Sequence, residues 1–371
     1  MKKFYLVSLC LIVFPLLGFS QGGNSKTAAR DSHKLTVVTY NVWYGLDGHG
    51  LFKMGEYETK ARREKRLELL IEGLKQLKPD IIFLQEVNPV DWVTDRIKKA
   101  LGYDAIFQLY NGGIKFFWLG IPTNLSMGLT ILAKKDLHLR NRGAGQISGP
   151  WGLYWPAFCF HLSEARFILA GSITVDGREI YLFNTHTHAS LPRDNRVLEE
   201  IEKWAKEGKI QAKDEARLKE EVKKDWARRD KELKAIGDFI VKKAGNKPFI
   251  LGGDFNTTMS STSMRALVKK LDLTDTFSSV NPDKKGYTWD PINNPNTKND
   301  ASFSFVNGDK KTGVDLLSAI YDRTVPRRID YIFLGGGLDA SNVESSVLVF
   351  NKPIGGLFPS DHYGVMSTLK F

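Results

Sequence analysis

Asp254 and Asn256 are the residues whose types and spacing most directly suggest chemistry. They follow an apolar run, Phe249–Leu251, and two glycines. Side chains two positions apart on an extended chain point to the same side, so the carboxylate and the amide would face one site. Such a pair at the end of a buried strand can hold a hard cation, orient a water molecule or bind a phosphoryl oxygen. A plain turn is the alternative, since Gly-Gly-Asp also begins turns.

Polar residues also follow other apolar segments of the chain. Each group alone would fit a helix cap, a turn or a surface position. Because all of them follow predicted strands, we expect them to meet at one edge of the fold and form an active site. The groups are Tyr40-Asn41, Gln85-Glu86, Asn184-Thr185-His186, and Asp330 with Ser360-Asp361-His362.

The elements that must position these residues alternate between strands and helices. Leucine and isoleucine at helical spacing predict a helix over 62–77, which Pro79 ends. With a strand on either side, this helix indicates a layered α/β fold. Apolar and β-branched runs predict strands over 34–40, 80–86, 129–133, 167–175, 180–184, 249–252, 328–334 and 365–369.

Residues from about 193 to 243 are dense in Lys, Arg and Glu. Apolar residues recur there every three or four positions, which predicts two or three amphipathic helices with one narrow apolar face. We expect the last helix to pack on a sheet and the rest to be a solvated excursion. A partner-binding arm is the alternative.

The N-terminus has the pattern of a secretory signal peptide, because Lys2 and Lys3 precede an apolar run that ends at Phe19. We expect a signal peptide over 1–20, a flexible leader over 21–33 and one domain over 34–371. The protein would be secreted or periplasmic, and no later run is long enough to cross a bilayer.

The composition favours anionic partners. The formal net charge is +11, which suits phosphates, nucleic acid or a lipid surface, although ordinary solubility also explains it. Once Cys10 leaves with the signal peptide, Cys159 is the only cysteine, which excludes an intramolecular disulfide. Stability must therefore come from a packed core.

Aromatic residues cluster at Phe116-Phe117-Trp118 and again between 151 and 160. Two interpretations fit this pattern. The rings can belong to the core face of strands, or they can form a surface that contacts lipid or stacks on bases.

Together, the polar groups resemble the active-site motifs of the endonuclease/exonuclease/phosphatase superfamily, which has the pancreatic deoxyribonuclease-like fold. The resemblance covers about residues 34–371. It implies a four-layered α/β sandwich, with two mixed β-sheets packed face to face and helices outside. It also implies a metal-dependent phosphodiesterase that uses Mg²⁺, with Mn²⁺ or another divalent cation as the alternative.

The resemblance assigns metal-binding roles to Glu86, Asn41 and Asp361. Glu86 would be the principal carboxylate ligand, with Asn41 close by, and Asp361 would reach the metal through water. Mg²⁺ keeps several waters and takes only one or two carboxylates, so this donor set suffices.

Catalytic roles follow from the same resemblance. Asp254 would orient or activate the attacking water. His362, oriented by Asp330, would donate to a non-bridging phosphoryl oxygen. Asn256 would hold a phosphoryl oxygen, and His186 would be a second histidine that serves catalysis and substrate binding.

Arg328 is a further substrate-binding candidate. It lies two residues before Asp330 on the same face of a predicted strand. A structural ion pair is the alternative role for this side chain.

Within the superfamily, the nearest resemblance is to the secreted neutral sphingomyelinase-like branch, through the segments 184–189, 287–291 and 360–363. His188 and Thr187 depart from that pattern. The segment 301–321, where those enzymes carry a membrane-inserting hairpin, shows few aromatic residues, among them Phe303 and Phe305. The branch implies release of a phospholipid headgroup with peripheral membrane contact, and we expect a monomer. The alternatives are a secreted nuclease acting on DNA or RNA, a phosphomonoesterase, and a non-catalytic surface binding module.

Overall fold

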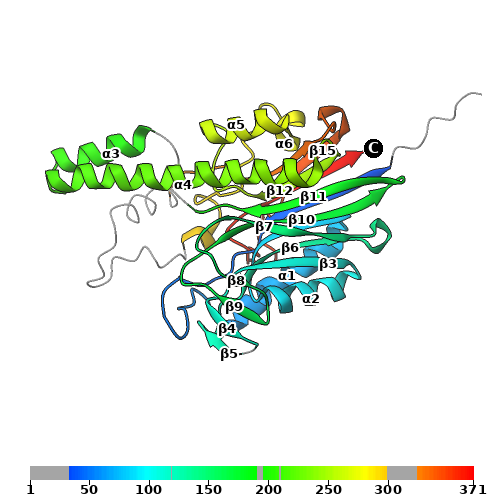
Figure 1. The fold of residues 1–371 in the computed structure, drawn as a ribbon, viewed down its shortest axis with the longest axis horizontal. Helices are drawn as coiled ribbons and strands as arrows, with labels where there is room; N and C mark the ends of the chain where they lie inside the picture. The colour runs from blue at the N-terminus through cyan, green and yellow to red at the C-terminus, as the bar shows by residue number, and fades with distance from the viewer. Residues whose placement is uncertain (1–32, 118, 190–194, 209, 299–323) are drawn as a thin grey trace, which may run out of the picture. The chain divides into compact units, whose positions relative to one another are not determined.

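Runs of apolar and β-branched residues form the strands at the centre of the protein, as Figure 1 shows. The structure is a computed structural model that describes residues 33–117, 119–189, 195–208, 210–298 and 324–371. The predicted signal peptide, all but the last residue of the predicted leader, Trp118 and the segment 301–321 lie outside the described residues.

The first sheet brings the beginning and the end of the domain together. Strand β1 pairs in parallel with β2 and antiparallel with β16. The spatial order is β15 (Val343–Val349), β16 (Gly364–Lys370), β1 (Lys34–Asn41), β2 (Ile81–Val87), β6 (Met127–Ala133) and β3 (Asp104–Asn111).

The second sheet is also mixed. Strands β11 and β12 run in parallel, and β14 runs antiparallel to β12. The spatial order is β13 (Thr274–Asp275), β14 (Asp330–Gly335), β12 (Phe249–Asp254), β11 (Arg178–His186), β10 (Arg166–Val175) and β7 (Arg140–Ser148).

These two six-stranded sheets pack face to face, and their inner side chains form the main core. The approach is close at Gly252 of β12, where a Cβ would lie 2.3 Å from the ring of Phe83 on β2. The absence of a side chain at Gly252 therefore lets β12 lie against the opposite sheet.

Helices cover the outer faces, which gives four layers (Figure 1). Helices α1 (Lys60–Leu77) and α2 (Val90–Leu101) cover the first sheet, and α4 (Ala212–Ala244) and α5 (Thr262–Leu271) cover the second. The predicted sandwich is thereby confirmed. Shorter helices are α6 (Thr276–Val280), η1 (Lys135–Leu137), η2 (Pro295–Lys298) and η4 (Ala340–Asn342).

Helix α1 is the helix expected over 62–77, and it begins two residues earlier. The side chain of Thr59 accepts a hydrogen bond from the backbone N–H of Arg62, which caps the N-terminus. Lys78 adopts a left-handed conformation just before Pro79, and its N–H reaches the carbonyl of Leu74. Both ends of the helix are therefore set by local chemistry.

The charged stretch forms α3 (Asn195–Lys206) and the 33-residue helix α4. The C-terminal part of α4 packs on the second sheet through Leu233 and Ile236, as expected for the last helix. Its N-terminal part packs on α3 around a separate apolar cluster that includes Trp204 and Trp226. The rest of the stretch is therefore a helical pair with a small core of its own.

A small third sheet contains β5 (Leu119–Ile121), β4 (Ile114–Phe116), β9 (Phe158–Phe160) and β8 (Leu153–Tyr154). These strands were not predicted from the sequence, and neither were β3, β7, β13 and β15. Strand β7 shows the reason, because its sequence, RNRGAGQIS, has few apolar residues and it pairs on one side only. Edge strands lack the continuous apolar run that marks a central strand.

Candidate active site

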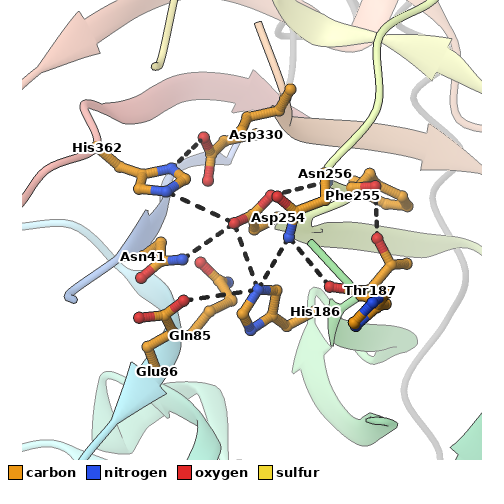
Figure 2. A network of polar contacts seen from close by, with 12 residues as sticks. Asn41, Gln85, Glu86, His186, Thr187, Asp254, Phe255, Asn256, Asp330 and His362 are labelled. Atoms are coloured by element: carbon orange, nitrogen blue, oxygen red, sulfur yellow. Dashed lines mark hydrogen bonds and ion pairs between the residues drawn. The ribbon is translucent and has the colours of Figure 1, made fainter. Parts of the chain in front are cut away.

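The ends of the central strands meet at one edge of the sandwich. Figure 2 shows the polar side chains that lie there. Parallel pairing puts the last residues of β1 and β2 side by side, and likewise those of β11 and β12. Strand β14 runs the other way, so its first residue, Asp330, pairs with Asp254 at the end of β12. Strand direction therefore brings together polar residues from distant parts of the sequence.

Asp254 is the centre of the cluster. The amide nitrogen of Asn41 donates to Asp254 Oδ2 at 3.0 Å. Nε2 of His186 lies 3.5 Å from the same oxygen, and Nε2 of His362 lies 3.8 Å from it. All four side chains are buried, so these contacts act in a medium of low polarity.

His362 is held by Asp330 and by a neighbouring segment. Its Nδ1 lies 2.9 Å from Asp330 Oδ2, and the ring of Trp289 meets the imidazole edge-on. Thr288 Oγ1 accepts hydrogen bonds from the backbone N–H groups of Ile329 and Asp330. The segment around Thr288 thus fixes both members of the histidine–carboxylate pair.

Asn256 adopts a left-handed backbone conformation, with φ of +46°. Its N–H donates to Asp254 Oδ1 at 2.8 Å. Its side-chain nitrogen donates to the carbonyl of Thr187 at 3.0 Å and lies 3.1 Å from Nε2 of His186. Asparagine tolerates this conformation better than most residues, and the tight turn brings its amide back toward the site.

Glu86 reaches the site because β2 is irregular there. The register with β6 shifts between Leu84 and Val87, and Glu86 has φ of +56°. Its Oε2 accepts a hydrogen bond from the N–H of Tyr44 at 3.2 Å, and its Oε1 lies 3.7 Å from His186 Nε2. A bulge of this kind re-aims a side chain that regular alternation would point elsewhere.

Asp361 is tied to the strand end that carries Asn41. The Ser360 hydroxyl lies 2.7 Å from the carbonyl oxygen of Asn41 and 3.0 Å from Asp361 Oδ1. The N–H of His362 donates to the same hydroxyl. The loop before β16 is therefore anchored to β1 and presents Asp361 and His362 together.

The cluster holds more negative charge than its own cations balance. Burial raises the pKa of Asp254 to about 7, and the nearby Asp330 carboxylate adds to the effect. Burial also raises the pKa of Asp361 to about 7 and raises the pKa of Glu86. For His362, burial disfavours the charged form, but the surrounding carboxylates outweigh it and hold the pKa well above its usual value.

The donor set fits a divalent metal. Asp254, Asp330 and His362 place ligand atoms within 4.8 Å of one another. The carboxylates with raised pKa values would be stabilised in their ionised form by a bound cation. Asp330 is already bound to His362, so the oxygens of Glu86 and Asp361 suit a hard cation better. Asn41 Oδ1 accepts from the N–H of Trp43 and keeps its second lone pair for a ligand.

Arg328 is placed differently from the substrate-binding role considered for it. Its guanidinium makes two hydrogen bonds to Asp275, at 2.9 and 2.6 Å, and a third to Ser278. It also lies over the ring of Tyr331. Its contacts therefore fit the alternative role, a structural ion pair.

Sequence reasoning missed two residues that touch His186. The hydroxyl of Tyr110, near the end of β3, lies 3.0 Å from His186 Nδ1, and Nη1 of Arg166 lies 2.9 Å from the same atom. Arg166 is the first residue of β10, which runs antiparallel to β11. The predicted site residues were those that follow strands. Arg166 instead begins a strand, and the antiparallel direction of β10 brings that first residue to the same edge.

Arg166 also helps to keep His186 uncharged. Burial is the first cause that lowers the pKa of His186, and the adjacent guanidinium lowers it further, so the imidazole stays neutral at physiological pH. Arg166 is balanced by Glu164, 2.7 Å away. The two histidines thus have opposite character, one neutral and one cationic, which suits different roles in one reaction.

Two pockets lie near this cluster, and Glu86 of the cluster lines one of them. One, of about 650 Å³, is lined by Glu86 together with Trp43, Tyr44 and Trp92 and by the cations Lys53, Lys60 and Arg63. The other, of about 430 Å³, is lined by Glu164, Tyr44 and apolar residues that include Ile114, Ile121 and Leu162. Tyr44 lines both pockets, so they flank the same part of the site.

Comparison with known proteins identifies the family. The model described as "Endonuclease/Exonuclease/phosphatase family" matches residues 38–206 and 222–362. These ranges include every polar group of the cluster. No curated protein sequence matches the chain.

Solved structures show the same fold at low identity. TDP2 of D. rerio, in complex with a single-strand DNA product, is 17% identical with a TM-score of 0.54, covering 91% of this chain and 99% of that one. An endonuclease/exonuclease/phosphatase from Bacteroides vulgatus is 14% identical, with a TM-score of 0.55 and coverage of 91% and 98%. A mannosyl-6-phosphatase from Bacteroides thetaiotaomicron is 18% identical, with a TM-score of 0.52 and coverage of 91% and 100%.

The family match spans well over half of the chain, and the buried carboxylates, amides and histidines gathered at its strand ends are suited to phosphoester chemistry. Whatever the substrate, the chemistry that this family performs is hydrolysis with a divalent metal. The chain belongs to the endonuclease/exonuclease/phosphatase family and is a metal-dependent phosphoester hydrolase.

Proposed function

We propose that the protein is an exported phosphodiesterase that releases the headgroup of a phospholipid, in the manner of a sphingomyelinase, with Mg²⁺ as its metal. The observation that carries the choice of lipid is the outer face of the small third sheet. That face is apolar, is exposed, and borders a pocket beside the catalytic cluster. Antiparallel sheets of soluble proteins normally turn polar side chains toward water.

The alternation along β4 and β9 shows how one-sided this sheet is. Phe158 and Phe160 are exposed, while Cys159 between them is buried. Their partners across the strands are Phe116, which is 58% exposed, and Ile114. The rings of Phe116 and Phe158 pack edge to face on the outside of the protein.

The apolar surface continues beyond these four residues, and we call the whole the apolar face. It further includes Leu119, Trp151, Leu153, Trp155 and Leu162. None of its members carries a charge, and Trp and Phe are the residues that lodge best at the boundary of water and hydrocarbon. Many exposed apolar side chains on one small sheet and the residues next to it mark an interaction surface. A zwitterionic lipid surface suits it, because no charge would be stripped of water on contact.

One pocket connects the apolar face with residues that contact the active site. Ile114 and Leu162 line the pocket of about 430 Å³, and Tyr44 and Glu164 also line it. Tyr44 donates to Glu86, and Glu164 pairs with the Arg166 that touches His186. A lipid whose chains remain in the membrane at the apolar face would present its headgroup phosphate to the cluster.

Asp254 and His362 have suitable positions for the chemical step. With a pKa of about 7, Asp254 accepts the proton of the attacking water while the new phosphorus–oxygen bond forms. The bond to the lipid oxygen breaks, and the departing lipid alkoxide takes up a proton from solvent water. Cationic His362, held by Asp330, donates to a non-bridging phosphoryl oxygen. Asn256 and neutral His186 hold the other oxygens. A divalent cation at Glu86 would neutralise charge on the phosphoryl group.

A side-by-side assay tests the proposal. Purified protein is given sphingomyelin vesicles, supercoiled plasmid DNA and p-nitrophenyl phosphate with Mg²⁺, and the His362→Ala variant serves as the control for contaminating activity. We expect phosphocholine release that EDTA abolishes. Plasmid nicking without phosphocholine release would make the protein a nuclease, and hydrolysis of the monoester alone would make it a phosphatase. No hydrolysis at all would favour a binding module.

Export is part of the proposal and is supported by the Lys2-Lys3 start and the apolar run that follows. Among the described helices, none is long and apolar enough to span a bilayer. Sequencing the N-terminus of protein recovered outside the cytoplasm should show a chain that begins near residue 21. An intact N-terminus on protein confined to the cytoplasm would contradict export.

A further inference from the structure

The charged helix α4 sends two buried side chains beneath the catalytic loops. Arg229 is 1% exposed and Glu232 is fully buried. They are three residues apart, so they lie on one face of the helix. The same face continues into Leu233 and Ile236, which pack on the second sheet.

Each of the two side chains forms a hydrogen bond with the backbone of a segment that carries catalytic residues. Nη1 of Arg229 donates to the carbonyl oxygen of Asn256 at 2.8 Å. Glu232 Oε2 accepts from the N–H of His188 at 2.8 Å, and its other oxygen accepts from the hydroxyl of Ser148. One helix face therefore holds the loop after β12 and the loop after β11.

The backbone conformation of Asn256 makes its hydrogen bond with Arg229 important for the site. Its left-handed backbone is a conformation that non-glycine residues adopt at a cost. Its carbonyl faces Arg229, while its side chain faces Thr187 and His186 on the other side. A hydrogen bond that fixes the carbonyl of Asn256 also fixes the plane of its peptide group. It therefore restricts the direction of the side-chain amide, which is proposed to hold a phosphoryl oxygen.

Stability alone is a poor explanation for these charges. Burial lowers the pKa of Arg229 to about 10, although the negative charges of Asp225 and Glu232 act to raise it. Replacing a buried ion pair with apolar residues of similar size is often neutral or stabilising. A buried arginine aimed at a carbonyl of the active site is better explained by what it positions.

We propose that Arg229 and Glu232 are positioning residues, through which α4 holds Asn256 and the segment after His186 in their catalytic geometry. The inference rests on the proposed role of Asn256 in phosphoester hydrolysis, and it is independent of which phosphoester is the substrate. The inference assigns a function to the part of the charged stretch that contains Arg229 and Glu232. The family match is interrupted at 207–221, nearer the far end of the helix, where α4 packs on α3.

A double-mutant cycle separates positioning from general damage. The variants are Arg229→Met, Asn256→Ala and the double variant, assayed with bis-p-nitrophenyl phosphate as diester and p-nitrophenyl phosphate as monoester. We expect Arg229→Met to lower kcat about 10- to 100-fold with KM changed less than about threefold, since small misplacements of catalytic groups have effects of this size. In the Asn256→Ala background the same substitution should cause little further loss.

Two further variants complete the design. Arg229→Lys keeps a donor near the carbonyl and should recover part of the lost kcat. Arg217→Met changes an exposed arginine of the same helix and should leave kcat unchanged. Should Arg229→Met fail to fold, the cycle is run with Arg229→Lys. Independent, multiplying losses in the double variant, or wild-type kcat in folded Arg229→Met, would overturn the inference.

The double-mutant cycle and the substrate assay can refute their two hypotheses independently. If the wild type hydrolyses a chromogenic ester but no lipid, the lipid substrate is wrong and the cycle still decides the role of Arg229. If lipid is hydrolysed and the losses multiply, the proposed function stands and the positioning role falls.

Discussion

Glu86 and His362 show how single residues acquire their roles from burial and neighbours. His362 is buried and Glu86 is partly buried in one group of neighbouring ionisable side chains. The effect of removing either side chain therefore depends on the charges of the others. Loss of a carboxylate relieves repulsion among the others, whereas loss of the cationic histidine increases it. Substitutions at the two positions should therefore affect stability in opposite directions.

Glu86→Gln should reduce metal-dependent turnover at least about 100-fold, because the side chain keeps its shape but loses the charge that a divalent cation needs. The melting temperature of the metal-free protein should stay level or rise, since a buried carboxylate with a raised pKa is removed. Kinetics across a Mg²⁺ series and thermal melting check both parts. Glu68→Gln, on the exposed side of α1, is the matched control; turnover retained in Glu86→Gln would contradict the assignment.

His362→Ala should lower kcat by about 10²- to 10⁴-fold, the range found for groups that exchange or share a proton in a transition state. Substrate binding should be largely kept, because Asn256 and His186 remain. Steady-state kinetics and equilibrium binding to sphingomyelin vesicles measure the two effects. His138→Ala, an exposed histidine beyond the far end of β6, should behave like the wild type; a similar loss there would point to a general defect.

The small third sheet is the element in which packing and function separate most clearly. Its inner side contributes Tyr154 and Cys159 to the main core, so the strands are anchored. Its outer side is the apolar face, which makes few contacts with the rest of the protein. Changes on the outer side should therefore alter association and leave the fold intact.

Phe116→Ser with Phe158→Ser should weaken binding to sphingomyelin vesicles by about tenfold for each side chain, the worth of burying one phenylalanine. Turnover of a short-chain, water-soluble substrate should stay within about twofold of the wild type. Vesicle sedimentation and soluble-substrate kinetics provide the two readouts. Val347→Ser is the control, because Val347 is an exposed apolar residue on the edge strand β15; unchanged vesicle binding in the phenylalanine variant would refute lipid docking at the apolar face.

At the scale of the whole molecule, the buried cluster links stability to pH and to metal. Asp254 and Asp361 have folded-state pKa values of about 7, above the ordinary value of 3.8. The folded state therefore binds their protons more tightly than the unfolded state does. Their contribution to stability is full below about pH 4 and is lost as the pH rises toward 7. The raised pKa of His362 acts in the same direction.

The metal-free protein should accordingly melt at a lower temperature at pH 8 than at pH 5. Added Mg²⁺ should raise the melting temperature by about 5 °C at pH 8 when its concentration is about 100 times Kd, and by less at pH 5. Scanning calorimetry in EDTA and in Mg²⁺ at the two pH values tests this. Equal metal effects at both pH values would contradict a cluster whose carboxylates ionise over this interval.

The family, the layered fold and most members of the cluster could be predicted from the order of the residues. Asp254, Asn256 and His186 directly follow or end apolar strands, and side chains at the ends of parallel strands must share an edge. Strand and helix positions were readable because local periodicity reports burial. The central strands and α1 lie within a few residues of their expected ranges.

Which side chains meet could be seen only in the folded protein. The bulge that turns Glu86 into the site arises from pairing between β2 and β6, and Arg166 arrives because β10 runs antiparallel to its neighbour. Arg328 pairs with Asp275, 53 positions away in the chain. Arg229 meets Asn256 because α4 covers the second sheet. Register, strand direction and helix placement depend on contacts between distant residues, and local periodicity carries no information about them.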